Sequence, residues 1–179
     1  MSRPRIIRDK HGHVYVERFS LFRRVEHAIA AGSFIMLLLT GFPQKFADGA
    51  LSHWIVDLFG GLETTRYVHR VSGVVFVIQA VVHAAVIVWG ALSGKMRMIL
   101  MPGFQDFRDL FANLAHFVGR RKKPKMPVFD YRQKFEYMGM VLGGLLMVFS
   151  GLALMYPVEV GQYVPGQIVL ALRAAHSFE

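Results

Sequence analysis

Eight histidines and no cysteines limit the redox chemistry that this chain supports. Without cysteine, the chain has no disulfide, no thiolate-bound metal cluster and no covalent haem attachment. Neutral imidazole is the commonest metal ligand among side chains. His69 and His83 are 14 residues apart, close to four helical turns, so they share one helix face about 21 Å apart along the axis. Two histidines on one face of an apolar helix predict two levels of haem iron ligation, which we favour over structural histidines.

Three apolar segments surround these histidines, and each is long enough to cross about 30 Å of hydrocarbon. We expect the first segment to end at Pro43 and the third at Pro157. A fourth apolar helix begins at about residue 168 and stops after roughly a dozen residues, so we expect it to be truncated. The three spans cover, by residue number, about 25–42, 71–92 and 137–156. With 54% hydrophobic residues, the sequence predicts a single all-α membrane domain over residues 1–179, an up-and-down four-helix bundle.

Lysine and arginine gather before the first span and between the second and third. Because such residues resist translocation, we expect a cytoplasmic amino terminus in a bacterial or archaeal inner membrane. No cleavable signal peptide is evident. The basic run at 120–125 favours a lipid-facing loop over nucleic-acid binding. Amphipathic stretches at 51–62 and 103–118 are predicted to lie along the membrane surface, and a lid over a quinone site or a partner-docking surface is the alternative.

The histidines sort into two levels when this topology is applied. His27 lies at the inner end of the first span, and His176 lies in the fourth helix, which starts outside. The outer pair is then His69 with His176, and the inner set is His27 and His83. Two axial imidazoles make each haem iron six-coordinate, which suits electron transfer because no position is left for a substrate.

Two arginines accompany the outer pair. Arg70 adjoins His69, and Arg173 precedes His176 by three residues on the same helix face. Each is expected either to bind a haem propionate or to extend to the membrane surface.

Two other function classes remain open for such a sequence. One is a haem-free membrane anchor that tethers a peripheral enzyme. The other is a proton or ion pathway through intramembrane histidines, although this chain has few intramembrane carboxylates for it. We find no internal repeat in the sequence and no dinucleotide-binding motif, so chemistry on a primary substrate is assigned to other subunits.

Four stretches resemble the membrane cytochrome b subunits of formate dehydrogenases, and the related subunits of nickel–iron hydrogenases and thiosulfate reductases. The stretches are RFSLFRRVEHAIAAGSFIMLLLTG, VHRVSGVVFVIQAVVHAAV, FDYRQKFEYMGMVLGGLLMVFSGLALMYP and LRAAHSFE. The resemblance implies a subunit with two b-type haems. Such a subunit passes electrons between an iron–sulfur or multihaem cytochrome c partner and the quinone pool.

The resemblance also implies a ligand set. His69 and His176 match the ligands of the outer haem, and His27 matches a ligand of the inner haem. The remaining inner ligand of the family falls beyond Glu179. His83 either replaces it or neighbours a quinone site, where Glu136 and Tyr137 are further candidate proton donors.

Overall fold

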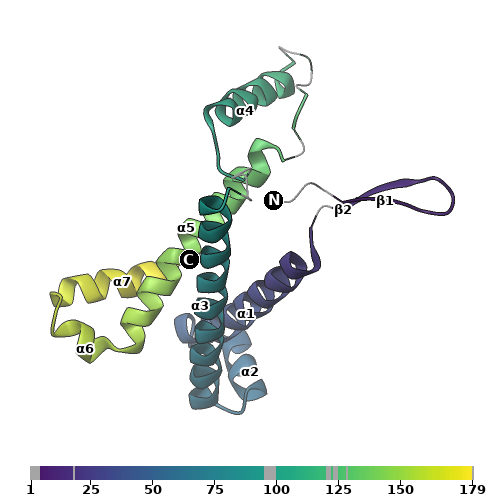
Figure 1. Cartoon of the computed structure of the whole chain (residues 1–179). Helices are drawn as coiled ribbons and strands as arrows, with labels where there is room; N and C mark the ends of the chain where they lie inside the picture. Colours follow the sequence, from purple (N-terminus) through teal and green to yellow (C-terminus); the bar gives the residue numbers. More distant parts are fainter. Residues whose placement is uncertain are drawn as a thin grey trace.

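The computed structural model describes residues 5–17, 19–94, 100–119, 122, 125–127 and 129–178. Most of the basic run at 120–125 therefore lies outside the described residues. Figure 1 shows a helical protein with an antiparallel hairpin near its amino terminus. The hairpin, which the sequence analysis did not predict, consists of β1 (Arg5–Arg8) and β2 (Val14–Glu17). The remaining elements are α1 (Leu21–Lys45), α2 (Ala50–Leu58), α3 (Leu62–Leu92), α4 (Phe104–Phe117), α5 (Tyr131–Met155), α6 (Pro157–Gly161) and α7 (Gly166–Phe178).

Among the described residues, three helices are long and apolar enough to cross a membrane, namely α1, α3 and α5. They cover the three predicted spans apart from Tyr156, and each helix begins earlier than predicted. Helix α1 begins at a cap in which the Ser20 hydroxyl accepts from the backbone N–H of Arg23. The expected end at Pro43 was wrong, because α1 continues to Lys45 with the proline inside its last turn. Helix α5 does end just before Pro157, which starts α6.

Burial is inverted relative to a water-soluble protein. Large apolar side chains such as Phe34 and Leu38 are more than half exposed, at 56% and 57%. The fully buried side chains are small and polar, and they are Thr40, Ser52, Thr65 and Ser150. In a membrane, apolar side chains face the lipid, and small residues between helices let the helices approach one another. The exposed apolar side chains of the three spans therefore suit contact with lipid.

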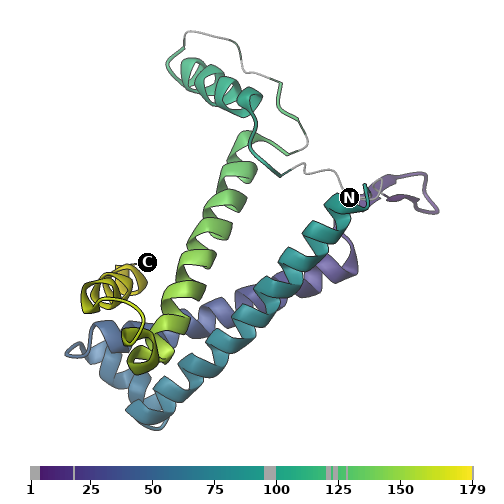
Figure 2. The same cartoon turned by 60° about the vertical axis from the view of Figure 1, so that its left-hand side comes forward.

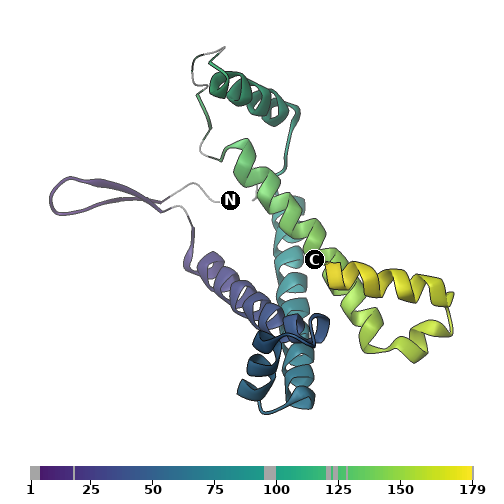
Figure 3. The same ribbon diagram turned by 180° about the vertical axis from the view of Figure 1, so that it is seen from behind.

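The helices pack as two pairs. Helix α1 packs along α3, and the shorter α7 folds back against α5, as Figures 1 and 2 show. The contact between the pairs is narrower and runs between α3 and α5. Figure 3 shows the same arrangement from behind, with α2 beside the end of α1 and start of α3. Each pair therefore forms one interface between two helices.

Helix α4 is attached to the first turn of α5 by two polar contacts. The Lys134 ammonium donates to both Asp106 carboxylate oxygens at 2.8 and 2.9 Å, and the Asn113 amide donates to the Tyr131 hydroxyl at 2.9 Å. Burial on its own raises the pKa of the Asp106 carboxyl. The Lys134 hydrogen bond and charge, with the Gly103 backbone N–H, outweigh burial and hold this pKa below its ordinary value. The amphipathic segment is thus helical, as predicted, and is fixed to α5.

Candidate functional site

His69 and His176 lie next to each other at the place where the two helix pairs meet. His69 comes from α3 and His176 from α7, and both side chains are partly buried. Their ring centroids are 6.3 Å apart, and the ring planes are inclined at 86°. The structure thus brings together two histidines that are 107 positions apart in the chain.

Each of these rings rests on a hydroxyl group of the neighbouring helix. The Nδ1 atom of His69 lies 2.9 Å from the Thr40 hydroxyl of α1. The Nδ1 atom of His176 lies 2.9 Å from the Ser150 hydroxyl of α5. Both contacts use Nδ1, so on each ring the second nitrogen, Nε2, remains available for a ligand.

The two rings together form a donor set that suits haem. Neutral imidazole nitrogens are suitable ligands for haem iron, and the hydroxyl contacts engage only the Nδ1 atom of each ring. His69 and His176, whose ring centroids are 6.3 Å apart, would therefore be able to hold one haem b.

His83 has a different environment, although it lies on the same helix as His69. Its Nδ1 atom lies 3.2 Å from a Glu26 carboxylate oxygen, and its Nε2 atom lies 3.1 Å from the Tyr137 hydroxyl. Arg23 donates to the other Glu26 oxygen at 2.7 Å and lies 3.4 Å from His83 Nδ1. We call these four residues, Arg23, Glu26, His83 and Tyr137, the polar cluster. It joins α1, α3 and α5 at one level, and both nitrogens of His83 are engaged within it.

The other predicted site residues are exposed. His27 lies one position after Glu26 on α1, and the structure does not place its ring against that of His83. Arg70 and Arg173 are exposed on α3 and α7. Arg173 also lines a surface groove with Leu154 and Pro157. In the part of the chain that the structure describes, neither arginine forms an ion pair, so both guanidinium groups are available near the His69 and His176 level.

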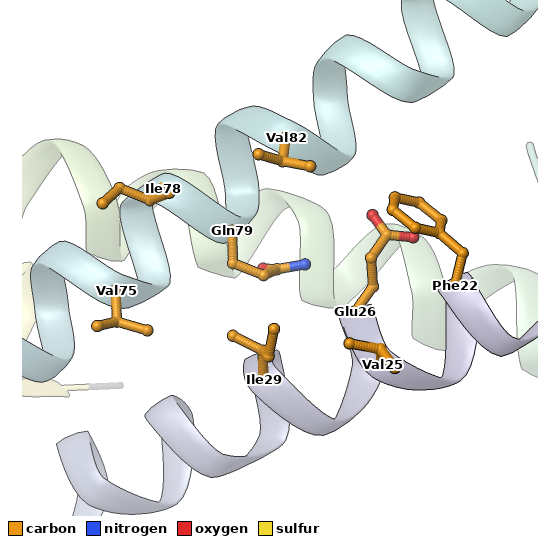
Figure 4. A pocket seen from close by; sticks show the side chains of 8 residues that line it. All are labelled: Phe22, Val25, Glu26, Ile29, Val75, Ile78, Gln79 and Val82. Carbon is orange, nitrogen blue, oxygen red and sulfur yellow. The ribbon is translucent and has the colours of Figure 1, made fainter.

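A groove of about 360 Å³ runs between α1 and α3 beside the polar cluster. Figure 4 shows the Glu26 carboxylate at one end of this groove and the Gln79 amide directed into it. The volume lies within the range of about 300–1,000 Å³ found for small-molecule sites, which are mainly apolar with a few polar groups. The other lining residues are Phe22, Val25, Ile29, Val75, Ile78 and Val82.

Sequence reasoning missed Thr40, Ser150 and Glu26 as parts of these sites. A hydroxyl in an apolar helix usually bonds a carbonyl of its own helix and attracts no attention. A signal was nevertheless present, because Thr40 and Ser150 are each followed by glycine near the end of an apolar span. Glu26 gave no comparable signal, because its contact with His83 joins residues 57 positions apart in the chain.

Membrane-spanning helices that bring histidines together between them are the architecture of a membrane cytochrome b. A family model described as prokaryotic cytochrome b561 matches residues 18–178, and the chain therefore belongs to that family. No curated protein matches the chain. Membership confirms the predicted membrane cytochrome b, with haem b binding, electron transfer and contact with lipid. The number of haems, their ligands, the quinone, the partner subunits and the side of the amino terminus stay predictions.

Proposed function

We propose that this chain transfers electrons between a peripheral redox subunit and the quinone pool, with His69 and His176 as the axial ligands of one haem b. The observation that carries this proposal is the 6.3 Å separation of the two rings, each held through Nδ1 on a hydroxyl of a neighbouring helix. When bound, haem b supplies a one-electron couple between ferrous and ferric iron. The protein supplies the two imidazoles, their orientation and an apolar environment. Arg70 and Arg173 are the proposed partners of the propionates.

We propose the cytoplasmic side for the amino terminus, on the basis of the lysine and arginine distribution. The His69 and His176 level then lies towards the outer surface. A peripheral subunit with iron–sulfur clusters or multiple c-type haems is the proposed partner there. The polar cluster lies towards the cytoplasmic surface, and His27 is the proposed ligand of a second haem b at that level.

His83 is the candidate for the second ligand of that haem within the described residues. Its hydrogen bonds to Glu26 and Tyr137 argue against that role, because both of its nitrogens already have partners. His83 then takes its alternative role, as a neighbour of the quinone site. Glu136, the remaining candidate donor from the sequence, is exposed on α5.

Quinone reduction needs protons as well as electrons, and the polar cluster is the proposed donor set. A tyrosine, a histidine and a carboxylate in hydrogen-bonded sequence can pass a proton along the chain Tyr137, His83 and Glu26. Glu26 lines one end of the groove between α1 and α3, and the accessible wall of this groove is apolar. We propose this groove as the place where the quinone ring meets these protons, with its apolar tail in lipid.

The test is optical spectroscopy of the detergent-purified protein with haem quantified per chain. Wild type is compared with His69→Ala, His176→Ala and His27→Ala, and His53→Ala is the control because His53 is an exposed residue of α2. We expect His69→Ala and His176→Ala to lose the same haem and His53→Ala to lose none. A second haem is expected to be lost in His27→Ala. Correctly folded wild type without a Soret band would overturn the proposal and favour the haem-free anchor.

A further inference from the structure

We propose that Thr40 and Ser150 are positioning residues that fix the protonation of His69 and His176 and thereby set the reduction potential of the haem between them. This inference rests on the proposed haem site. Neither hydroxyl contacts the iron in this arrangement, so each acts through its histidine.

The direction of the hydrogen bonds follows from counting protons. A hydroxyl has a single hydrogen to donate. Thr40 donates it to the Met36 carbonyl at 2.6 Å, and Ser150 donates it to the Leu146 carbonyl at 2.7 Å. Each hydroxyl oxygen therefore accepts from the histidine, so the Nδ1 atom carries the proton. Nε2 is left as a bare nitrogen with a lone pair, which is the form that binds a metal ion.

Next to each hydroxyl residue, a glycine leaves room for the histidine ring. We call each pair of a hydroxyl residue and the following glycine a seat. A Cβ atom on Gly41 would lie 3.2 Å from the His69 Cε1 atom, and one on Gly151 would lie 3.1 Å from the His176 Cε1 atom. The hydroxyl thus contacts one edge of the ring, and the following glycine leaves space for the ring because it has no Cβ atom. The two seats consist of Thr40 with Gly41 and of Ser150 with Gly151.

The same arrangement recurs at equivalent positions of two helices. Helices α1 and α5 each have 25 residues, and each is capped by a side chain, Ser20 or Asp130. The caps, the hydroxyl residues and the glycines each differ by 110 in residue number. The two helices are not recognisable as a sequence repeat, because they share few other residues. Recurrence of the whole seat in both helix pairs indicates a function that each histidine needs.

That function is electronic as well as geometric. A hydrogen bond from the second ring nitrogen raises the basicity of a metal-bound histidine. A more basic imidazole stabilises ferric iron relative to ferrous iron and lowers the reduction potential. Removal of the hydroxyl is therefore expected to raise the potential. In the described part of the chain, the Nδ1 atom of each histidine meets one hydroxyl, Thr40 or Ser150, at 2.9 Å. The two effects should therefore be similar in size.

The experiment uses the full chain in detergent with its haem, and it compares Ser150→Ala and Thr40→Val with the conservative variants Ser150→Thr and Thr40→Ser. Redox titration of the reduced haem band gives the potential. We expect Ser150→Ala to favour the reduced form about tenfold, a shift of about 59 mV for one electron. Thr40→Val should give a shift of similar size in the same direction. The conservative variants should stay close to wild type.

A second measurement keeps the inference separate from the haem proposal. In wild-type apoprotein labelled with ¹⁵N-histidine, nuclear magnetic resonance should report protonated Nδ1 and bare Nε2 for His69 and His176. The opposite protonation, or an unchanged potential in Ser150→Ala that retains its haem, would overturn the inference. Wild type that binds no haem defeats the proposed function instead, and the apoprotein spectrum still decides whether the hydroxyls fix the ring protons.

Discussion

The glycine of each seat offers a perturbation whose size follows directly from the structure. Ordinary contact with a Cβ atom begins at 3.4 Å, whereas the Gly151→Ala and Gly41→Ala methyl groups would lie 3.1 and 3.2 Å from the histidine Cε1 atoms. The ring of His176 must therefore move by at least 0.3 Å (3.4 − 3.1), and that of His69 by at least 0.2 Å (3.4 − 3.2). Metal–ligand distances are held within about 0.2 Å. We expect Gly151→Ala to be the more harmful variant.

We expect Gly151→Ala to weaken haem binding by about 10- to 100-fold, the range seen when support for a metal-bound histidine is removed. Gly41→Ala should weaken it by less than about tenfold. The structure supplies a matched control on each helix, because a Cβ on Gly139 of α5 or on Gly32 of α1 meets nothing within 4 Å. All four glycine-to-alanine substitutions, at the two seats and at the two control positions, improve helix propensity by a similar amount, about 0.5–1 kcal/mol.

The assay is haem titration into apoprotein, followed at the Soret band, together with the rate of haem transfer to an excess of a soluble haem-binding protein. A difference between Gly151→Ala and Gly139→Ala isolates the contact with the ring from the change in helix propensity. If these two variants bind haem equally well, His176 does not hold the haem in the orientation that the structure gives it, and the reasoning fails.

Two further predictions concern the polar contacts. Glu26→Gln and Tyr137→Phe should each slow haem reduction by a quinol about 100-fold, because each removes a proposed proton carrier, and haem content should not change. An unchanged rate in both variants would remove the polar cluster from the quinone reaction. Because the pKa of Asp106 is lowered, its contribution to α4 docking is complete above its ordinary pKa of 3.8 and is lost as pH falls through the lowered value. The hydrogen-exchange protection factors of α4, which are corrected for the intrinsic pH dependence of exchange, should therefore be constant at pH 5–8 in wild type. Lys134→Met should loosen α4 at neutral pH, and protection should return on acidification.

The sequence predicted the membrane helices well, because apolar runs of this length have few alternative structures. In the structure, the ends of these helices differ from the predicted ends for local reasons. Helix α1 starts at Leu21 rather than near Val25 because the Ser20 cap and the contact of Arg23 with Glu26 satisfy its polar first turns. Its end lies past Pro43, and the backbone N–H of Phe46 still bonds the Phe42 carbonyl beyond the proline.

Pairing between helices was harder to predict, because helical spacing says which residues share a face but not what they meet. The juxtaposition of His69 with His176 followed from topology, since both had been placed near the same side of the membrane. The polar cluster did not follow, because it needs α1, α3 and α5 to converge on His83, and no local pattern encodes that convergence.

His69 and His83 share one helix face and were assigned the same role from sequence, but their hydrogen bonds distinguish them. A metal ligand needs one nitrogen held and the other free, and His69 meets this condition through Thr40. A proton carrier needs a partner on each nitrogen, so that one bond is made as the other is broken, and His83 meets that condition between Glu26 and Tyr137. Helix α3 thus carries two histidines about 21 Å apart along its axis whose surroundings suit different proposed roles, ligation at His69 and proton transfer at His83. Under the proposed function, the second haem and the polar cluster lie at the same level, so that a quinone there would meet both electrons and protons.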